Sequence, residues 1–383
     1  MRVLVCCRDG FGHFHAMVPM ARALLHSGHE VRIACGPSFR EHVTASGFDM
    51  VDSGISVPVA QPMAAERFPE VRDLPKNQRW RFGHAMFAGI IAPAAYDDLM
   101  QAVADWSPDL LLFEPMEFAA PVVAARTSTR AVQVSWGPAR PRAWLEFGAS
   151  YAAPTWVRAG LDPDPLAGLR GHPYLDVCPD VLQLPNLDDL PTVLAARYVA
   201  YDGPPHPLPA WLDGRRERPL FYVTLGTVFG AATDVFDVIL AGLHDIDADV
   251  LVAAGPHGDL AATSRGGRVR AERWVPQSLV LERCDVVVSH CGANTLMGAA
   301  ARGVPHLAVP QAADQFLNAE VLEAAGAGIA LTDPLSPDAI CAAATRLLGD
   351  SAYRDAANLA ASQIAARPHP DDLVDTLTEL ARA

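Results

Sequence analysis

Short runs of apolar residues alternate with longer stretches of helical periodicity along most of this chain. In the first part the apolar runs are residues 2–7, 29–35, 108–115 and 131–136. Between the first two, Met17, Met20, Ala21 and Leu24 recur at helical spacing. Strands that are apolar on both faces are typical of a parallel sheet with helices on either side. The alternation therefore predicts an α/β fold.

The same alternation stops and starts again, which predicts two domains. It weakens between about residues 140 and 215, where Pro, Asp and Gly are frequent, and it resumes at residue 220. A length of 383 residues also fits two domains. We expect two Rossmann-like parallel-sheet domains that face each other across a cleft. The predicted bounds are a first domain at 1–205, a Pro-rich linker at 206–218, a second domain at 219–365, and a C-terminal helix at 366–383 that packs back toward the first domain.

Charge and cysteine content exclude several classes of partner. The formal net charge of −14 disfavours nucleic acid and anionic membranes. The seven cysteines have no paired metal spacing, and the opening MRVLVCC is typical of a first strand rather than of a signal peptide. No apolar run has the length of a membrane span. We expect a cytoplasmic protein that binds neither nucleic acid nor the membrane interior.

The loop after the first predicted strand carries two histidines. Its sequence RDGFGHFH begins like a dinucleotide fingerprint, but His15 occupies the place of the third glycine, and the second strand ends without an acid. Nicotinamide binding is therefore disfavoured. His13 is placed to act as a general base, and Glu114, at the end of another strand, is placed to orient it. The alternatives are a capping or loop role for His13, a solvated Glu114, and His15 as the base.

The second half offers groups suited to a nucleotide sugar. Thr227 ends a TLGT loop that could hold a phosphate, and Trp274 could stack on a base or belong to the core. His290 and Thr295 flank a predicted helix N-terminus, which favours a diphosphate. Asp314, followed by Gln315, has groups for sugar hydroxyls or for helix capping.

The order of these residues resembles the donor signature of the GT-B nucleotide-sugar glycosyltransferases. The matching segments are Trp274-Val-Pro-Gln277, His290-Cys-Gly-Ala-Asn-Thr295, Gly303-Val-Pro305 and Asp314-Gln315-x-x-Asn318-Ala319, and residues 12–31 resemble the N-terminal signature. The family is the inverting one that includes plant natural-product and bacterial antibiotic glycosyltransferases, and the composition points to the bacterial branch.

The resemblance implies a role for each matching residue. His13 corresponds to the general base and Glu114 to its acidic partner, which is usually Asp. Trp274 corresponds to the residue that stacks on the base, and His290 and Thr295 to the diphosphate ligands. The complete donor side implied in this way consists of Thr227, Trp274, Val275, Gln277, His290, Gly292, Asn294, Thr295, Asp314 and Gln315.

Two positions depart from the family pattern. Gly298 stands where the family usually has a Glu that holds the ribose hydroxyls, and Cys291-Gly292 replaces the Gly-Gly of most bacterial members. Without that carboxylate, a 2′-deoxyribose is the better ligand, because it has one hydroxyl fewer. We therefore expect a dTDP-sugar as the co-substrate.

No metal or other cofactor is expected. The acidic triplets at 162–164 and 247–249 resemble metal motifs of other glycosyltransferases, but neither follows an apolar strand. Aromatic residues of the first half could line an apolar acceptor pocket or belong to the core. The candidates are Trp80, Phe82, Trp136 and Trp144.

These observations predict a metal-independent inverting glycosyltransferase. It would move a hexose, expected to be a deoxysugar, from dTDP to a hydroxyl of an apolar natural-product aglycone such as a polyketide. Two alternatives stay open: a nucleotide-sugar epimerase or hydrolase of the same fold, and a non-catalytic nucleotide-sugar-binding auxiliary protein. A homodimer is also left open.

Overall fold

The computed structural model describes residues 1–184, 187, 189–212, 214, 217–227, 233–255, 258, 263 and 267–382. Contacts divide the chain into two compact units. Unit 1 comprises Met1–Cys178, Leu184–Tyr201 and Arg367–Ala383, and unit 2 comprises Pro179–Gln183 and Asp202–Ala366.

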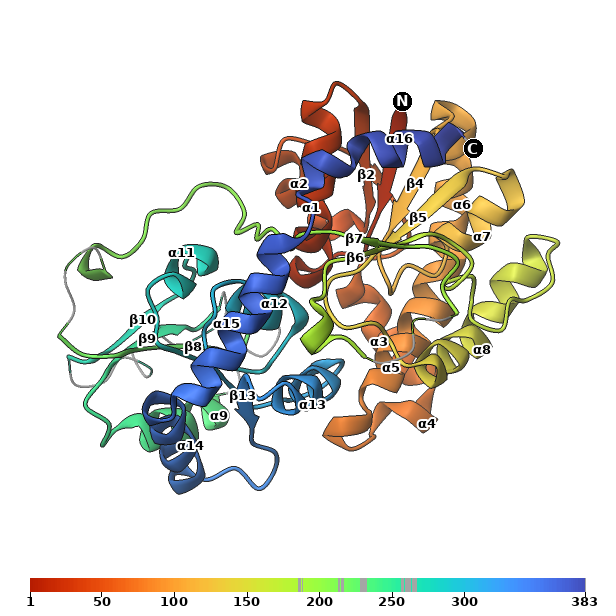
Figure 1. Ribbon diagram of the computed structural model, residues 1–383. Coiled ribbons are helices and arrows are strands. Elements are labelled where there is room, and N and C mark those ends of the chain that lie inside the picture. The colour runs from red at the N-terminus through yellow and green to blue at the C-terminus, as the bar shows by residue number, and fades with distance from the viewer. Residues whose placement is uncertain are drawn as a thin grey trace. The chain divides into compact units, whose positions relative to one another are not determined.

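Unit 1 is built on a seven-stranded sheet with the order β3-β2-β1-β4-β5-β6-β7, in which every neighbouring pair is parallel (Figure 1). The strands are β1 (Arg2–Cys6), β2 (Glu30–Cys35), β3 (Asp49–Asp52), β4 (Leu110–Phe113), β5 (Arg130–Val134), β6 (Tyr174–Asp176) and β7 (Val193–Ala195). The sheet is central to the unit, since residues of both its faces, such as Val3 and Leu4, are fully buried.

Helices connect these strands. They are α1 (Phe11–His26), α2 (Arg40–Ala45), α3 (Val57–Arg67), α4 (Pro69–Arg72), α5 (Trp80–Met86), α6 (Ala92–Trp106), α7 (Ala120–Thr127), α8 (Arg142–Arg158) and α16 (Val374–Arg382), with the short turns η1 (Pro37–Phe39), η2 (Lys76–Gln78), η3 (Phe87–Ile91) and η6 (Pro370–Leu373). Figure 1 shows the blue C-terminal helix α16 beside the red N-terminal part of unit 1. Its Val374 and Leu377 are buried in the core that β1 forms with α1.

Unit 2 repeats the plan with six parallel strands in the order β10-β9-β8-β11-β12-β13. The strands are β8 (Leu220–Thr224), β9 (Asp249–Ala253), β10 (Val269–Glu272), β11 (Val286–Ser289), β12 (His306–Ala308) and β13 (Gly328–Ala330). The helices and turns are α9 (Thr233–Leu243), α11 (Gln277–Leu281), α12 (Ala293–Ala301), α13 (Gln315–Ala324), α14 (Pro337–Gly349), α15 (Ser351–Ala366), η4 (Asp180–Leu182) and η5 (Ala210–Leu212).

Alternate residues of the unit 2 strands enter two separate cores. Phe221 and Val223 of β8 pack with α9 and α14, whereas Leu220 and Tyr222 pack with α11 and α12. The central strands β8 and β11 are buried on both faces, and they are apolar except for their last residues, as a covered parallel sheet requires. The edge strand β10, Val-Arg-Ala-Glu, has no buried residue.

The predicted fold class, two α/β units on parallel sheets, is confirmed. The sequence analysis missed β3, β6 and β7, which are only three or four residues long. Residues 213, 215 and 216 of the predicted linker, and 228–232, 256–257, 259–262 and 264–266 of the predicted second domain, lie outside the described residues. Within the described part of the chain, no helix is long and apolar enough to cross a bilayer.

Candidate active site

In both sheets, several of the predicted site residues follow the two strands between which the strand order reverses. The reversal lies between β1 and β4 in unit 1 and between β8 and β11 in unit 2. Ligands of open parallel sheets bind at the carboxyl ends of the strands at such a point. His13 follows β1 and Glu114 follows β4, while Thr227 follows β8 and His290 follows β11.

His13 and Glu114 form a hydrogen-bonded pair at the unit 1 reversal. Nδ1 of His13 lies 2.9 Å from Oε1 of Glu114. The Glu114 side chain is fully buried, and its Oε2 accepts the N–H of Met116 at 2.5 Å. The carboxylate is therefore held by two donors, and it fixes the proton of the imidazole on Nδ1.

The other ring nitrogen of His13 is left for a ligand. Phe87 and Trp136 lie against the ring, at centroid distances of 5.3 and 4.8 Å. The side chain remains 22% exposed. Its Nε2 has no hydrogen-bond partner among the described residues. An imidazole held in this way presents a basic Nε2 lone pair, which is the arrangement that a general base needs.

His15, the competing candidate, occupies a different environment. It lies among aromatic rings, 5.3 Å from Phe11 and 4.9 Å from Tyr201 between ring centroids. Burial and the neighbouring His42 lower the pKa of His15 to about 4. The geometry therefore favours His13 over His15 as the base.

The four aromatic acceptor candidates divide into two groups. Trp136 contacts His13 directly and is 7% exposed. Trp80 and Trp144 instead stack on each other, with ring centroids 4.4 Å apart and an interplanar angle of 11°. Phe82 is half-buried in the same helix as Trp80. Only Trp136 is thus shown beside the His13–Glu114 pair.

In unit 2, the loop after β8 packs against His290. Gly226 has a φ of 71°, in the left-handed region, and a Cβ there would lie 2.8 Å from the His290 ring. A Cβ at Gly292 would come within 2.6 Å of Nε2 of the same ring. Glycine is therefore required at both positions for the ring to take its place. Thr227, the next residue of the β8 loop, is half-buried.

His290 is neutral at physiological pH. Burial lowers the pKa of His290 to about 4, which the Asp314 carboxylate and a backbone hydrogen bond with Thr224 only partly oppose. In the free protein the imidazole is therefore an N–H donor and not a cation. Positive potential in this loop comes instead from the N-terminus of α12, which begins at Ala293 after the cap residue Gly292.

The turn between β11 and α12 depends on a residue in the left-handed region. Cys291 has a φ of 61°, and its N–H donates to Ser289 Oγ at 2.9 Å. Ser289 Oγ in turn lies 2.7 Å from Nε2 of the buried His306 in β12. Asn318 Nδ2 donates to the Cys291 carbonyl at 2.9 Å. Three side chains thus hold the turn that precedes the helix N-terminus.

The residues after β12 lie close to this turn. Asn318 Nδ2 also donates to Asp314 Oδ2 at 3.1 Å, and the Asp314 carboxylate acts on the pKa of both His290 and Cys291. Gln315 is buried, and its Oε1 accepts the N–H groups of Gln311 and Ala312 at 2.8 and 3.0 Å. The Asp314 carboxylate therefore lies close enough to His290 to act on its charge, whereas the carbonyl oxygen of Gln315 holds the loop.

The remaining donor candidates stand at the loop after β10 and at the start of α12. Trp274 and Asn294 are half-buried, whereas the side chain of Val275 is 5% exposed and lies in the core. Gln277 Oε1 accepts the hydroxyls of Thr295 and Tyr222 at 3.3 and 3.4 Å. The bond between Thr295 and Gln277 links the start of α12 to the start of α11. Because the Trp274 loop leads directly into α11, this bond holds that loop close to the N-terminus of α12.

Gly298 is buried within α12, five residues after the first residue of the helix, Ala293. The two acidic triplets have other partners: Asp164 Oδ1 accepts the N–H groups of Leu166 and Gly168 at 2.8 Å, and Asp247 Oδ1 pairs with Arg218 at 2.8 Å and Arg268 at 3.1 Å. Among the described residues, no three His, Cys, Asp or Glu side chains converge as metal ligands.

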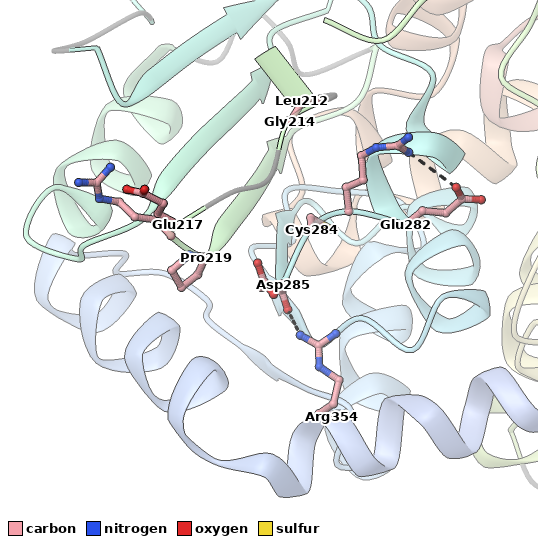
Figure 2. A pocket seen from close by; sticks show the side chains of 10 residues that line it. Leu212, Gly214, Glu217, Pro219, Glu282, Cys284, Asp285 and Arg354 are labelled. Carbon is pink, nitrogen blue, oxygen red and sulfur yellow. Dashed lines mark hydrogen bonds and ion pairs between the residues drawn. The ribbon is translucent and has the colours of Figure 1, made fainter. Parts of the chain in front are cut away.

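A pocket of about 740 Å³ lies at the opposite edge of the unit 2 sheet (Figure 2). Its walls include Pro219 and Asp285, which precede β8 and β11, and Arg354, which donates to the Asp285 carbonyl. Because parallel strands begin at one edge and end at the other, this pocket is remote from His290. A second pocket of about 470 Å³ likewise lies at the start of strands, near Leu110 and Arg130 in unit 1.

The sequence analysis missed the side chains that support the site. Asn318 belongs to the donor motif but had no predicted role, and neither Ser289 nor His306 was assigned one. Arg8 and Glu117, a buried ion pair near the His13–Glu114 pair, were also missed. The sequence signal for this ion pair is that each of the two charged residues lies just past the end of a strand. Charged residues in loops are usually solvated, so this signal alone does not predict a buried pair.

Comparison with known proteins identifies two adjoining domain families. The N-terminal domain of erythromycin biosynthesis protein CIII-like proteins matches residues 22–226, and the C-terminal domain of the same proteins matches residues 237–380. The order of the two matches agrees with the order of the two units along the chain.

Individual relatives match along the whole chain. Tylactone mycaminosyltransferase of Streptomyces fradiae is 31% identical, over 99% of this chain and 92% of the relative. L-demethylnoviosyl transferase of Streptomyces niveus is 34% identical, over 100% and 99%. The crystal structure of the Streptomyces sp. SF2575 glycosyltransferase SsfS6, complexed with thymidine diphosphate, superposes with a TM-score of 0.81 at 27% identity and covers 99% of each chain. The chain therefore belongs to the erythromycin biosynthesis protein CIII-like family of GT-B glycosyltransferases, and it is a glycosyltransferase.

Proposed function

We propose that this enzyme transfers a deoxysugar from a dTDP-sugar to a hydroxyl group of a polyketide-like aglycone, with inversion at the anomeric carbon. The relatives named for transfer to tylactone and for transfer of L-demethylnoviose support the substrate class. The thymidine diphosphate in SsfS6 supports the nucleotide. Unit 1 would bind the acceptor and unit 2 the donor. A cytoplasmic location and a homodimer remain expectations.

The observation that carries the mechanism is the His13–Glu114 hydrogen bond at the unit 1 strand reversal. In the proposed reaction, Nε2 of His13 takes the proton of the acceptor hydroxyl as its oxygen attacks the anomeric carbon. The buried Glu114 carboxylate, 2.9 Å from Nδ1, stabilises the imidazolium that forms. The bond between the anomeric carbon and the diphosphate oxygen breaks, and dTDP leaves.

The unit 2 loops would stabilise the leaving diphosphate. The α12 N-terminus supplies backbone N–H groups and partial positive charge, and the neutral His290 supplies a further N–H. Thr295 and Thr227 would add hydroxyl donors, Trp274 would stack on thymine, and Asp314 would accept sugar hydroxyls. These donors replace the charge stabilisation that a metal ion gives in other glycosyltransferases, so we propose a metal-independent reaction.

Gly298 supports the deoxynucleotide. A glycine at this buried helix position has no carboxylate that could accept a hydrogen bond from a ribose 2′-hydroxyl. The position therefore makes no contact that would favour UDP over dTDP. We expect dTDP to bind more tightly than UDP when both are titrated calorimetrically. Tighter binding of UDP would refute this part of the proposal.

Trp136 is the acceptor-side residue that the geometry supports best. It lies edge-on to the His13 ring, and its Nε1 has no hydrogen-bond partner among the described residues. We propose that Trp136 lines the aglycone site. Trp80, Phe82 and Trp144 lie in a neighbouring aromatic group and would extend the apolar surface.

Replacement of His13 by Ala tests the base directly. With the base removed, kcat should fall by roughly 100- to 10,000-fold while dTDP binding to unit 2 stays unchanged. The matched control is His15→Gln, which alters the neighbouring histidine and should leave kcat within a few-fold. Full transfer activity in His13→Ala would refute the assignment.

A further inference from the structure

The side chain of Asp202 holds Ser278 by three hydrogen bonds, and neither residue has a role in the proposed function. The Ser278 N–H is shared between the two carboxylate oxygens of Asp202, at 3.1 Å from Oδ1 and 3.2 Å from Oδ2. The Ser278 hydroxyl donates to Oδ2 at 2.5 Å. Both residues are half-buried. Asp202 is the residue at which the chain enters unit 2 after Tyr201, so it comes from outside the donor motifs.

These bonds fix the beginning of α11, in which Ser278 is the second residue. The first N–H groups of a helix have no acceptor within the helix, and a carboxylate at this end also interacts favourably with the helix dipole. With five residues, α11 is too short to be stable without tertiary contacts. Val280 and Leu281 anchor its far end in the core, and Asp202 anchors its start.

The start of α11 also determines where the Trp274 loop lies. Trp274 precedes Ser278 by four residues, and the buried Val275 and Pro276 lie between them. Gln277, the first residue of α11, accepts the Thr295 hydroxyl at 3.3 Å and so links the same point to α12. A shift of the α11 start would therefore move the indole of Trp274 relative to the α12 N-terminus.

We propose that Asp202 is a positioning residue for the nucleoside end of the donor, because it holds the α11 start and thereby the Trp274 loop in the conformation that binds thymine. A loop that is ordered beforehand loses little conformational entropy on binding, whereas a loop that is ordered only part of the time lowers the apparent affinity. The inference rests on the proposed function, which makes Trp274 the residue that stacks on thymine. Asp202 itself needs no contact with the donor.

Three variants of the full-length protein test this role. Asp202→Ala removes both acceptors of the Ser278 N–H and hydroxyl. Asp202→Asn keeps one side-chain oxygen for them and is the conservative variant. Ser278→Ala removes the hydroxyl and leaves the N–H bonded to the carboxylate. The affinities for dTDP and for inorganic pyrophosphate are measured by calorimetry, since pyrophosphate probes the diphosphate end alone.

Asp350→Ala is the matched control in the same unit. Asp350 Oδ1 accepts the N–H of Ala352 at 3.1 Å, and Ala352 is likewise the second residue of its helix, α15. Arg354, in the same turn of α15, donates to the carbonyl of Asp285, which directly precedes β11. The control therefore removes the same kind of helix-start contact at the edge of the sheet opposite to His290.

Hydrogen exchange in the ligand-free protein reports the position of the α11 start. The N–H of Ser278 bonds to Asp202, and those of Leu279 and Val280 bond to the Pro276 carbonyl, each at 3.1 Å. In Asp202→Ala these amides should exchange roughly tenfold faster, as expected when a helix loses the contact that caps its start. In Asp350→Ala they should exchange at the wild-type rate.

In Asp202→Ala the dissociation constant of dTDP should rise roughly five- to tenfold, and that of pyrophosphate should change less than twofold. The KM for the dTDP-sugar should rise by the same factor as the dTDP constant, with kcat within twofold of wild type, because the base takes no part in bond breaking. Ser278→Ala should weaken dTDP binding roughly two- to threefold. Asp202→Asn and Asp350→Ala should stay within twofold of wild type.

Several results would overturn the proposal. Unchanged dTDP affinity in Asp202→Ala, at whatever exchange rate, would show that Asp202 only supports the fold. An equal loss of pyrophosphate affinity, or an equal loss of dTDP affinity in Asp350→Ala, would show a general loosening of unit 2. Should Asp202→Ala fail to fold, Ser278→Ala decides: weaker dTDP binding with unchanged pyrophosphate binding supports the proposal, and unchanged dTDP binding refutes it.

Failure of the proposed function gives a different result. A wild-type protein that binds no dTDP would refute the nucleotide assignment, and with it the role of Asp202. A wild-type protein that binds dTDP no better than Asp202→Ala does would refute the role of Asp202 alone.

Discussion

Gly226 offers a sharp test of the unit 2 site, because its replacement acts on His290 without removing any proposed ligand. A Cβ at Gly226 would lie 2.8 Å from the Cε1 and Nε2 atoms of His290, whereas ordinary contacts begin at 3.4 Å. In Gly226→Ala the ring must therefore retreat by about 0.6 Å. Gly292 also lies close to the ring, since a Cβ there would come within 2.6 Å of Nε2, so the room for that retreat is small.

The cost in Gly226→Ala has two parts. An alanine in the left-handed region, here at a φ of 71°, costs roughly 1–2 kcal/mol of stability. Displacement of His290 should weaken dTDP binding about tenfold, which corresponds to about 1.4 kcal/mol. Isothermal titration calorimetry with dTDP measures the second part, and chemical denaturation measures the first.

Gly267 provides a matched control in the same unit. Its φ is also 71°, but a Cβ there would meet no atom of the described residues within 4 Å. Gly267→Ala should lose a similar amount of stability and bind dTDP within twofold of wild type. Unchanged dTDP affinity in Gly226→Ala, or an equal loss in Gly267→Ala, would show that the position of His290 does not matter for the donor.

Three further predictions concern pH and the acceptor. The pKa of His290 in the free protein is about 4, and we expect the ring to stay neutral when dTDP is bound. The ratio of the dTDP affinities of wild type and His290→Gln should then be constant from pH 5.5 to 8 by calorimetry. A ratio that grows toward low pH would show that the bound diphosphate protonates the ring. Burial lowers the pKa of His306 to about 3. Between pH 6.5 and pH 5 this histidine is therefore protonated in the unfolded chain but not in the folded chain. His306 should lower the free energy of unfolding by about 2 kcal/mol over this range. Denaturant titrations of His306→Asn should lose that part of the slope, and a slope equal to that of wild type would contradict the burial argument. Trp136→Phe, which removes the Nε1–H donor, should raise the acceptor KM several-fold. Trp156→Phe, at an equally buried tryptophan, should leave the acceptor KM unchanged. Equal acceptor KM values for the two variants in steady-state assays would exclude Trp136 from the acceptor site.

Much of the fold could be predicted because its strands are buried on both faces. Runs such as residues 220–223 and 286–288 are wholly apolar, which is typical of strands in a parallel sheet that is covered on both faces. The missed strands lack this signal. β3 reads Asp-Met-Val-Asp with exposed ends, and β6 and β7 have three residues each. Pairing with a neighbouring strand, rather than their own sequence, makes them strands.

The site could be predicted where chemistry follows a strand end directly. His13, Glu114, His290 and Asp314 all do so, and carboxyl ends of parallel strands share one edge of a sheet. The local sequence could not show that burial makes His290 neutral, because that depends on Gly226, which comes from another strand.

Supporting contacts were missed for the same reason. Arg8 and Glu117 meet only because β1 and β4 are neighbours. Gln315 was expected to bind sugar hydroxyls through its amide. In the fold its Oε1 is occupied by two backbone N–H groups, a contact set by the shape of the loop after β12.

The central claim is transfer of a sugar from dTDP to an acceptor hydroxyl, with unit 1 supplying the base. Its most direct test is incubation of the purified protein with a panel of dTDP-deoxysugars, with and without polyketide aglycones, followed by mass spectrometry and by NMR of the anomeric centre. The account predicts a glycoside of inverted configuration, formed only when the aglycone is present and lost in His13→Ala. A new sugar nucleotide or free sugar without aglycone, or thermal stabilisation by dTDP-sugars with no turnover of any pair, would contradict it.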